Sequence, residues 1–335
     1  MKFIRIILFP IVPIYYLVTW VRNRMYDYGI RSSKSYDFPV ICVGNLSTGG
    51  TGKTPMIECL IRLLKDEKSL ATLSRGYQRH TNGFKLADSE STADSIGDEP
   101  FQFFRKFEGI RVAVDANRQH GIEELMSLDQ KPEVILLDDA FQHRKVRAGF
   151  NILLTDYNNL YYKDIVLPTG NLREPRSGSK RADIIIVTKC KKNLSEGEKT
   201  SITTKLKLKN NQKVFFSYVD YSNSVISDFK EMELATLPQF TLVTGIANAK
   251  PLVDFLVEQG LKFAHLEFGD HYNFRASDIE TLESKSLIVT TEKDYVRLCV
   301  NKSLKAKLYY LPIQIKIDKM EAFDESVMSF VSQKS

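Results

Sequence analysis

The sequence of 335 residues predicts an α/β protein, with a doubly wound, mainly parallel sheet followed by a second, smaller α/β domain. Three observations predict this class. A glycine-rich loop lies between an apolar strand and the start of a helix at residues 43–55. Short runs of Val, Ile and Leu then alternate with helical stretches, as in parallel strands joined by crossover helices. A second alternation of this kind begins at Phe240.

The N-terminal segment, residues 3–20, is nearly all apolar. As a straight helix this segment would be about 27 Å long, close to the thickness of a bilayer core. Two prolines and an arginine within it argue against a regular helix that spans the membrane. We therefore expect a helix within residues 1–28 that lies on the inner leaflet surface of a membrane, with its basic residues on anionic headgroups. A buried core helix at the start of the chain is the alternative.

Residues 48–54 predict a phosphate-binding loop. Their glycines let backbone N–H groups point at an anion, and the helix that begins near Lys53 adds its positive end. We expect Lys53 to bridge the outer phosphates of a nucleoside triphosphate and the Thr54 hydroxyl to ligate its magnesium. The expected phosphate-binding residues are Thr48, Gly49, Gly50, Thr51, Gly52, Lys53 and Thr54.

The loop departs from the general motif at Ser47, where a glycine is usual. A buried strand at residues 40–43 and an apolar helical pattern at residues 56–64 nevertheless supply the strand, loop and helix that the motif requires. A P-loop NTPase-like fold is therefore predicted. An ordinary glycine-rich turn beside a lysine is the alternative.

The other strands and the domain limits follow from the same patterns. Further strands of the first sheet are predicted at residues 70–73, 110–114, 134–137, 151–154 and 184–187. A lysine-rich segment at residues 189–213 marks a junction, followed by a strand-like run at residues 214–219. In the second domain we expect strands at residues 241–244, 263–268 and 287–289, and a helix at residues 251–258. The predicted domains are the N-terminal helix at residues 1–28, a P-loop domain at residues 29–213, and linker strands with the smaller domain at residues 214–335.

Two acidic motifs are candidates for the reaction chemistry. Asp138 and Asp139 end the strand at residues 134–137, where a phosphate-loop enzyme holds magnesium or its waters; the opening of a turn is the structural alternative. Asp98, in Gly97-Asp98-Glu99-Pro100, precedes a helical stretch. This carboxylate either caps the helix or accepts the proton of a substrate hydroxyl, and the residues alone leave both open.

Basic and polar side chains near other strand ends are further candidates. Arg75 and Arg173 suit the clamping of phosphate groups, with simple solvation at the surface as the alternative. In the second domain, residues 268–272 and 290–294 follow apolar strands and so face a potential cleft. A lone histidine such as His271 is more often structural than catalytic.

The composition excludes several classes of protein. Four cysteines without C-x-x-C spacing indicate neither a disulfide framework nor a zinc site, and fit a reducing compartment. The formal charge of +6 favours an anionic partner. No pattern of an RNA- or DNA-binding module is present, so no nucleic-acid partner is expected.

Taken in order, the segments GNLSTGGTGKTP, LSRGY, GDEP, LLDDAFQHR, NLREP, GDHY and TTEKD resemble the tetraacyldisaccharide 4′-kinase family of lipid A biosynthesis over nearly the full chain. That family also lacks the leading glycine of the loop and has an N-terminal membrane-seated helix. The resemblance implies transfer of the γ-phosphate of ATP, with Mg²⁺, to the 4′-hydroxyl of a tetraacyldisaccharide 1-phosphate. This lipid A precursor would be met at the cytoplasmic face of the inner membrane.

The resemblance also implies roles for single residues. Lys53 and Thr54 would bind phosphates and magnesium, Asp138 and Asp139 would complete the metal site, Asp98 would be the base, and His271 would orient or tune Asp98. Tyr272 stands where many members of the family have a second histidine, which leaves the geometry of that partner open. A histidine from the second domain also implies closure of the domains upon nucleotide binding.

Two alternatives differ from a lipid kinase. A GTPase or metal-insertion ATPase is disfavoured because Lys191 stands where a guanine reader has an aspartate, and Thr48 where the partitioning ATPases have a lysine. A membrane-tethered scaffold would bind nucleotide without turnover. The three candidate aspartates at positions 98, 138 and 139 argue against it.

Overall fold

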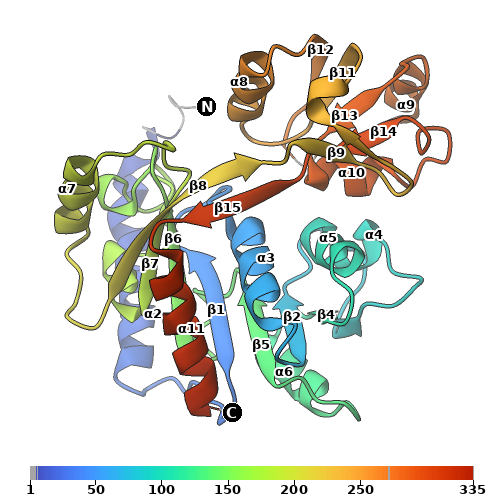
Figure 1. Cartoon of the computed structure of the whole chain (residues 1–335). Coiled ribbons are helices and arrows are strands. Elements are labelled where there is room, and N and C mark those ends of the chain that lie inside the picture. Colours follow the sequence, from blue (N-terminus) through green and yellow to red (C-terminus); the bar gives the residue numbers. More distant parts are fainter. Residues whose placement is uncertain (1–4, 6, 271, 335) are drawn as a thin grey trace.

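The computed structural model describes residues 5, 7–270 and 272–334, which form a larger and a smaller lobe joined by a two-stranded ribbon (Figure 1). The larger lobe contains a nine-stranded sheet in the order β15-β8-β7-β6-β1-β5-β2-β4-β3. The smaller lobe contains a six-stranded sheet in the order β10-β9-β14-β13-β11-β12. The predicted α/β class is confirmed.

The centre of the nine-stranded sheet is parallel, as its continuous apolar strands predict. The parallel strands are β1 (Val40–Asn45), β2 (Leu70–Ser74), β4 (Arg111–Val114), β5 (Val134–Asp138), β6 (Phe150–Asp156), β7 (Ile184–Thr188) and β8 (Lys213–Tyr221). Two antiparallel edge strands, β3 (Lys85–Leu86) and β15 (Ile313–Ile317), complete it. In the register, Val43 of β1 lies between Asp138 of β5 and Ile152 of β6. The glycine loop and the two aspartates therefore leave the same edge of the sheet.

Helices cover both faces of this sheet, and each face has its own apolar core. One face is covered by α3 (Lys53–Leu64), α5 (Asp98–Lys106) and α11 (Met320–Lys334), and the other by α2 (Val12–Asp27), α6 (Arg118–Met126) and α7 (Glu196–Leu206). The short helices of this lobe are η1 (Phe9–Ile11), α4 (Ala93–Ile96), η2 (Tyr161–Lys163) and η3 (Arg176–Arg181). Helix α3 buries Met56, Ile57, Leu60, Ile61 and Leu64, at the spacing of one helix face. Burial of this face fixes the helix that begins at Lys53.

The smaller lobe is an α/β unit of its own. Its strands are β9 (Ser224–Ile226), β10 (Glu231–Glu233), β11 (Phe240–Thr244), β12 (Phe263–Glu267), β13 (Ile288–Thr290) and β14 (Leu308–Tyr310). Its helices are η4 (Leu234–Thr236), α8 (Lys250–Glu258), α9 (Ala276–Glu283) and α10 (Glu292–Leu298). The predicted strands and helix in this part of the chain are present within a residue or two.

The predicted division at residue 213 assigns the whole C-terminal part of the chain to the smaller domain and its linker strands. In the structure, the C-terminal end of the chain returns to the larger lobe. Strand β8 pairs with β7, and β15 pairs with β8. Phe215, Ile315 and Phe323 are buried in the core beneath α3. By sheet membership the smaller lobe is therefore an insertion between β8 and β15, because the apolar faces of β15 and α11 are buried against the first sheet.

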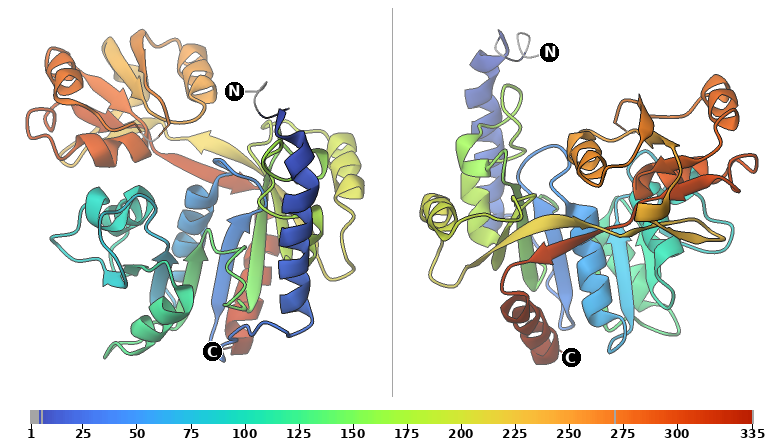
Figure 2. Two further views of the ribbon diagram at one scale, coloured as in Figure 1. Left: turned by 180° about the vertical axis from the view of Figure 1, so that it is seen from behind. Right: turned by 45° about the horizontal axis from the view of Figure 1, so that its top comes forward.

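The N-terminal helix packs only one side against the protein. Figure 2 shows α2 running along the outside of the larger lobe. Ile14, Leu17 and Val18 are 64%, 57% and 61% exposed, and Asn23 is the one buried residue of α2. Among the described residues, no helix is long and apolar enough to cross a bilayer. These exposed side chains exclude the alternative of a buried core helix.

Gly44 of β1 provides a test of the packing beneath the loop. A Cβ atom at this position would lie 2.6 Å from Cβ and 3.1 Å from the backbone N of Phe141. We expect Gly44→Ala to lower the free energy of unfolding by about 1–3 kcal/mol, because the backbone of residue 141 must shift. Urea unfolding measures the change.

The matched control is Gly197→Ala in α7, where an added Cβ meets nothing within 4 Å. This variant should be as stable as the parent or more stable by about 0.5–1 kcal/mol. Equal stability of the Gly44 variant and the control would contradict the close packing of β1 on Phe141.

Candidate active site

The glycine loop, residues 46–52, is held in a wrapped conformation between β1 and α3. Gly49 and Gly52 have φ angles of +99° and +87°, which side chains rarely adopt. From the end of β1, the Asn45 side-chain amide donates to Thr51 Oγ1 at 2.7 Å and to the Gly49 carbonyl at 3.4 Å. The loop is thus shaped by its own strand before any ligand is considered.

The end of β7 supports the loop from a second side. Thr188 Oγ1 donates to the Thr51 carbonyl at 2.8 Å. Lys189, with a φ of +56°, donates from Nζ to the Gly50 carbonyl and pairs with Asp156 at 2.9 Å. The sequence predicted a strand at residues 184–187 and a domain junction from residue 189, but no local pattern predicted that Thr188 and Lys189 contact the loop.

Asp139 faces the first turn of α3, as the phosphate-loop interpretation requires. Lys53 Nζ lies 3.7 Å from Asp139 Oδ1, and Arg173 Nη1 donates to Oδ1 and Oδ2 at 2.9 and 3.1 Å. Burial raises the pKa of Asp139, but the charges of Lys53 and Arg173 outweigh it and lower the pKa overall. Lys53, Asp139 and Arg173 thus form one charged group beside the loop.

Asp138, the neighbour of Asp139 in the chain, is buried, and its pKa is shifted in the opposite direction. Its Oδ2 atom accepts a hydrogen bond from Ser74 Oγ at 3.3 Å, whereas Oδ1 is buried without a partner in the described structure. Burial, reinforced by Asp139, raises the pKa of Asp138 to about 7. Two adjacent carboxylates are therefore held with opposite pKa shifts.

Arg118 is a buried cation that the sequence analysis missed. Nη1 donates to the Asp115 carbonyl at 2.9 Å and Nη2 to the Asp138 carbonyl at 3.1 Å. Its Nε atom is buried without a partner in the described structure, and burial lowers its pKa to about 10. Arg118 lies just beyond the carboxyl end of β4, at the same edge of the sheet as the other site residues. This position after a predicted strand is the feature of the sequence that could have identified it. Arg75, also beyond a strand end, is exposed.

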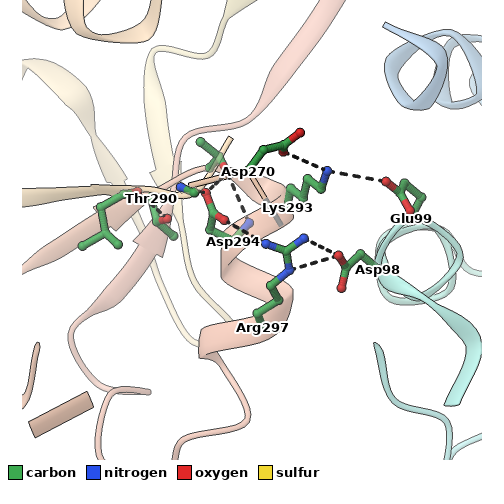
Figure 3. Close-up of polar contacts among 10 residues, drawn as sticks. Asp98, Glu99, Asp270, Thr290, Lys293, Asp294 and Arg297 are labelled. Carbon is green, nitrogen blue, oxygen red and sulfur yellow. Dashed lines mark hydrogen bonds and ion pairs between the residues drawn. The ribbon is translucent and has the colours of Figure 1, made fainter. Parts of the chain in front are cut away.

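The predicted base, Asp98, begins α5 and faces the smaller lobe (Figure 3). Arg297 of α10 donates to Asp98 Oδ2 from Nε at 3.0 Å and also from Nη2. Asp294, which is fully buried, accepts from Arg297 Nη1 at 3.5 Å and from the Gly245 backbone N–H at 2.8 Å. A cation fixed within the smaller lobe therefore holds Asp98.

The sequence motifs that contain Asp98, Asp270 and Asp294 meet at this contact. Lys293 Nζ lies 3.6 Å from Glu99 Oε1 and 3.7 Å from Asp270 Oδ1 (Figure 3). The charge of Glu99 also raises the pKa of Asp138, which links this cluster with the loop. His271 lies outside the described residues, so its partnership with Asp98 stays a prediction. Arg297 was missed because it lies three residues beyond the TTEKD segment.

A second set of charged residues connects the two lobes through α3, the helix that follows the glycine loop. Lys106 Nζ of α5 lies 2.7 Å from Glu58 Oε2 of α3 and also pairs with Glu292 of α10. Glu58 further accepts from Gln102 Nε2 at 2.8 Å and Arg62 Nη2 at 2.9 Å. Burial, with the charge of Glu58, raises the pKa of Glu292. The helices that carry Lys53, Asp98 and Arg297 are thus connected through Lys106.

The segment Asn171–Glu174, termed here the brace, contacts the loop, Asp139 and the N-terminal helix. The Thr48 N–H donates to the Asn171 carbonyl at 2.8 Å, and the Arg173 N–H to the Leu46 carbonyl at 2.7 Å. From α2, Tyr15 Oη donates to the Arg173 carbonyl at 2.9 Å and Asn23 Nδ2 to Glu174 Oε2 at 2.5 Å. Glu174 is buried and also accepts from Gln142 at 2.9 Å and Arg181 at 2.7 Å.

Comparison with known proteins relates the chain to one family. The model of the family described as tetraacyldisaccharide-1-P 4′-kinase matches residues 4–332. The curated tetraacyldisaccharide 4′-kinase of Flavobacterium johnsoniae is 50% identical, with 99% of each chain covered. That of Bacteroides fragilis is 43% identical, covering 98% of this chain and 93% of its own. The crystal structure of LpxK from Aquifex aeolicus in complex with ATP superposes with a TM-score of 0.78 at 28% identity, covering 98% of this chain and 99% of that one.

The buried charges between the lobes predict a pH dependence of stability. The raised pKa of Glu292 means that the folded protein takes up a proton that the unfolded chain, with an ordinary value of 4.5, does not. Its stabilising contribution is present at low pH and is lost as the pH rises through the folded pKa. The groups that face it are Glu58, Lys106 and Arg62.

We therefore expect Glu292→Gln to flatten the loss of stability between pH 4.5 and neutrality, by at most roughly 1.4 kcal/mol per pH unit for one proton. Chemical unfolding at several pH values measures the slope. Glu321→Gln, at an exposed position of α11, should leave the slope unchanged. The same slope in the parent and the Glu292 variant would rule out the raised pKa.

Proposed function

The chain belongs to the tetraacyldisaccharide 4′-kinase family, and we propose that it transfers the γ-phosphate of ATP to the 4′-hydroxyl of a tetraacyldisaccharide 1-phosphate in lipid A biosynthesis. The observation that carries this assignment is the contact of Lys53 with Asp139 beside the glycine loop. A loop lysine and a strand-end carboxylate are the parts with which P-loop enzymes hold and neutralise a triphosphate.

In this proposal the phosphates lie in the glycine loop. The backbone N–H groups of residues 49–54 and the N-terminus of α3 bind the phosphate oxygens, and Lys53 neutralises the outer phosphates. The Thr48 N–H, predicted to bind phosphate as well, instead donates to the Asn171 carbonyl. Arg173 contacts the same carboxylate as Lys53, so its guanidinium group also lies close enough to neutralise charge on the outer phosphates. Arg75, exposed beyond β2, remains a candidate for phosphate contacts of the lipid.

The residues beside the loop fit Mg²⁺, which prefers oxygen ligands. The fit rests on Asp138, whose Oδ1 atom is buried and unpartnered in the described structure, as expected for an oxygen that faces a cation or its water. Thr54, Asp138 and Asp139 would hold the ion. The described residues contain no group of three or more His, Cys, Asp or Glu that could bind a metal by themselves, which fits an ion shared with the nucleotide. When bound, Mg²⁺ neutralises charge on the phosphates during transfer.

We assign the role of general base to Asp98. As the oxygen of the 4′-hydroxyl attacks the γ-phosphorus, its proton passes to the Asp98 carboxylate. The bond between the γ-phosphorus and the oxygen that bridges to the β-phosphate breaks, and ADP leaves. Arg297 and Lys293 orient the acidic end of α5 from the smaller lobe. His271, which lies outside the described residues, would act on the same carboxylate.

The exposed apolar side of α2 supports a location at the cytoplasmic surface of the inner membrane. Large apolar side chains at positions 14, 17 and 18 face away from the protein, with Arg24 and other basic residues on the same helix. A helix of this kind lies in the interface between headgroups and acyl chains. Such a position would bring the active site to a substrate whose acyl chains stay in the bilayer.

Asp98→Asn tests the base. The amide keeps the size of the side chain but cannot take the proton, so transfer of labelled phosphate from ATP to the disaccharide lipid should fall roughly 10²–10⁴-fold in kcat. ATP binding, measured by calorimetry, should be retained. The exposed neighbour Asp94 supplies the control Asp94→Asn, which should transfer phosphate at the parent rate. Undiminished transfer by the Asp98 variant would falsify the assignment.

Two substitutions on α2 test the membrane surface. Leu17→Gln with Val18→Gln should lower association with lipid vesicles at least about tenfold, because each apolar side chain contributes about 1.5–3 kcal/mol when fully buried. ATP affinity should not change, since neither side chain contacts the loop. Val257→Gln, at a position of the smaller lobe that is 60% exposed, is the control. If the α2 variant bound vesicles like the parent, this face of the helix would not be the membrane contact.

A further inference from the structure

A cavity of about 260 Å³ lies between α2 and the η3 turn, outside the candidate active site. Four of its lining side chains are basic: Arg24 on α2, Lys180 and Arg181 on η3, and Lys209 on the turn before β8. No residue of the glycine loop and none of the candidate catalytic residues lines it. Its chemistry is therefore separate from that of the phosphate loop.

Most of the positive charge in this cavity is uncompensated. Arg181 pairs with Glu174 at 2.7 Å, and the one acidic lining residue, Asp27, pairs with Arg144 at 2.8 Å. Within the described part of the chain, Arg24, Lys180 and Lys209 form no ion pair with a carboxylate. Three cations that converge on a cavity without a protein counter-charge favour an anion.

The cavity also contains an unsatisfied hydrogen-bond acceptor. Asn23 lines it and is only 8% exposed. Its Nδ2 atom donates to Glu174, whereas its Oδ1 atom is buried without a partner among the described residues. A buried carbonyl oxygen of this kind requires a donor. The cavity is thus suited to a ligand with both an anionic group and a hydroxyl group.

The position of the cavity on α2 indicates where such a ligand comes from. Trp20 and Arg24 line it. Leu17 and Val21, each three residues away on the same helix, are 57% and 41% exposed, and Tyr28, directly after the helix, is 72% exposed. The basic cavity therefore adjoins the apolar side that faces the acyl chains in the proposed function. A phosphate with a glycerol hydroxyl, attached to acyl chains, matches both features.

We propose that this cavity binds the headgroup of an anionic phospholipid of the phosphatidylglycerol type. The phosphate contacts Lys180, Lys209 and Arg24, and a headgroup hydroxyl donates to Asn23 Oδ1. This inference rests on the membrane position assigned above. Asn23 and Arg181, which line the cavity, both bind Glu174 of the brace. The neighbouring residue of the brace, Arg173, contacts Asp139, so the cavity is connected with the candidate active site.

Vesicle binding by the full chain tests the proposal. Lys180→Gln with Lys209→Gln should lower affinity for vesicles of phosphatidylcholine with phosphatidylglycerol about tenfold or more, since each basic residue near an anionic surface contributes about 1 kcal/mol. Binding to pure phosphatidylcholine should not change. Lys302→Gln with Lys305→Gln removes equal charge from the exposed surface of the smaller lobe and should have little effect. Transfer to substrate dispersed in neutral detergent should match the parent, which shows that the variant is folded.

Competition identifies the bound group. Soluble glycerol 1-phosphate should displace the parent from the mixed vesicles at lower concentration than inorganic phosphate, and Asn23→Leu should abolish this difference. Equal competition by the two anions would indicate a site for free phosphate only and would overturn the proposal. Equal loss of binding in both lysine pairs would show diffuse attraction and overturn it as well. A parent protein that binds no vesicle of either kind would instead refute the membrane position, while phosphate transfer in detergent would still stand.

Discussion

The site depends on the brace, residues 171–174, because this short segment fastens three parts of the larger lobe to one another. Its backbone pairs with the glycine loop at Leu46 and Thr48. Its Arg173 side chain contacts Asp139, and its buried Glu174 carboxylate binds Asn23 of the N-terminal helix. The brace therefore fixes the conformation of the glycine loop, the position of Asp139 and the position of α2 relative to one another. A displacement of α2 would be transmitted to the loop through hydrogen bonds that are largely shielded from water.

The second constraint is electrostatic and lies between the lobes. Helix α5 has Asp98 and Glu99 at one end and Lys106 at the other. These three residues pair with Arg297, Lys293 and Glu292 of α10, respectively. These charges are partly or fully buried, so removal of one partner leaves another without compensation. The orientation of the smaller lobe is thus specified at the two ends of the helix that carries the predicted base. The ribbon of β8 and β15 connects the lobes but contributes none of these charges.

Local patterns were sufficient for the fold and for half of the site. The apolar strands, the glycine loop and the acidic strand ends follow from rules of sequence periodicity and register, so Lys53, Asp138 and Asp139 could be placed together in advance. Arg297, Glu174 and Asn23 could not. Arg297 binds Asp98 and Asn23 binds Glu174 across more than a hundred residues of chain, and no local pattern identifies a long-range hydrogen bond. The return of β15 and α11 to the first sheet was hidden for the same reason.

Hydrogen exchange on Glu174→Ala tests the central claim that the brace holds the phosphate loop. Loss of this carboxylate frees the side chains of Asn23, Gln142 and Arg181, so amide exchange should accelerate in residues 45–54 as well as in residues 171–174. Exchange in residues 240–256 of the smaller lobe should match the parent. Faster exchange confined to residues 171–174, with unchanged protection of residues 45–54, would contradict the account.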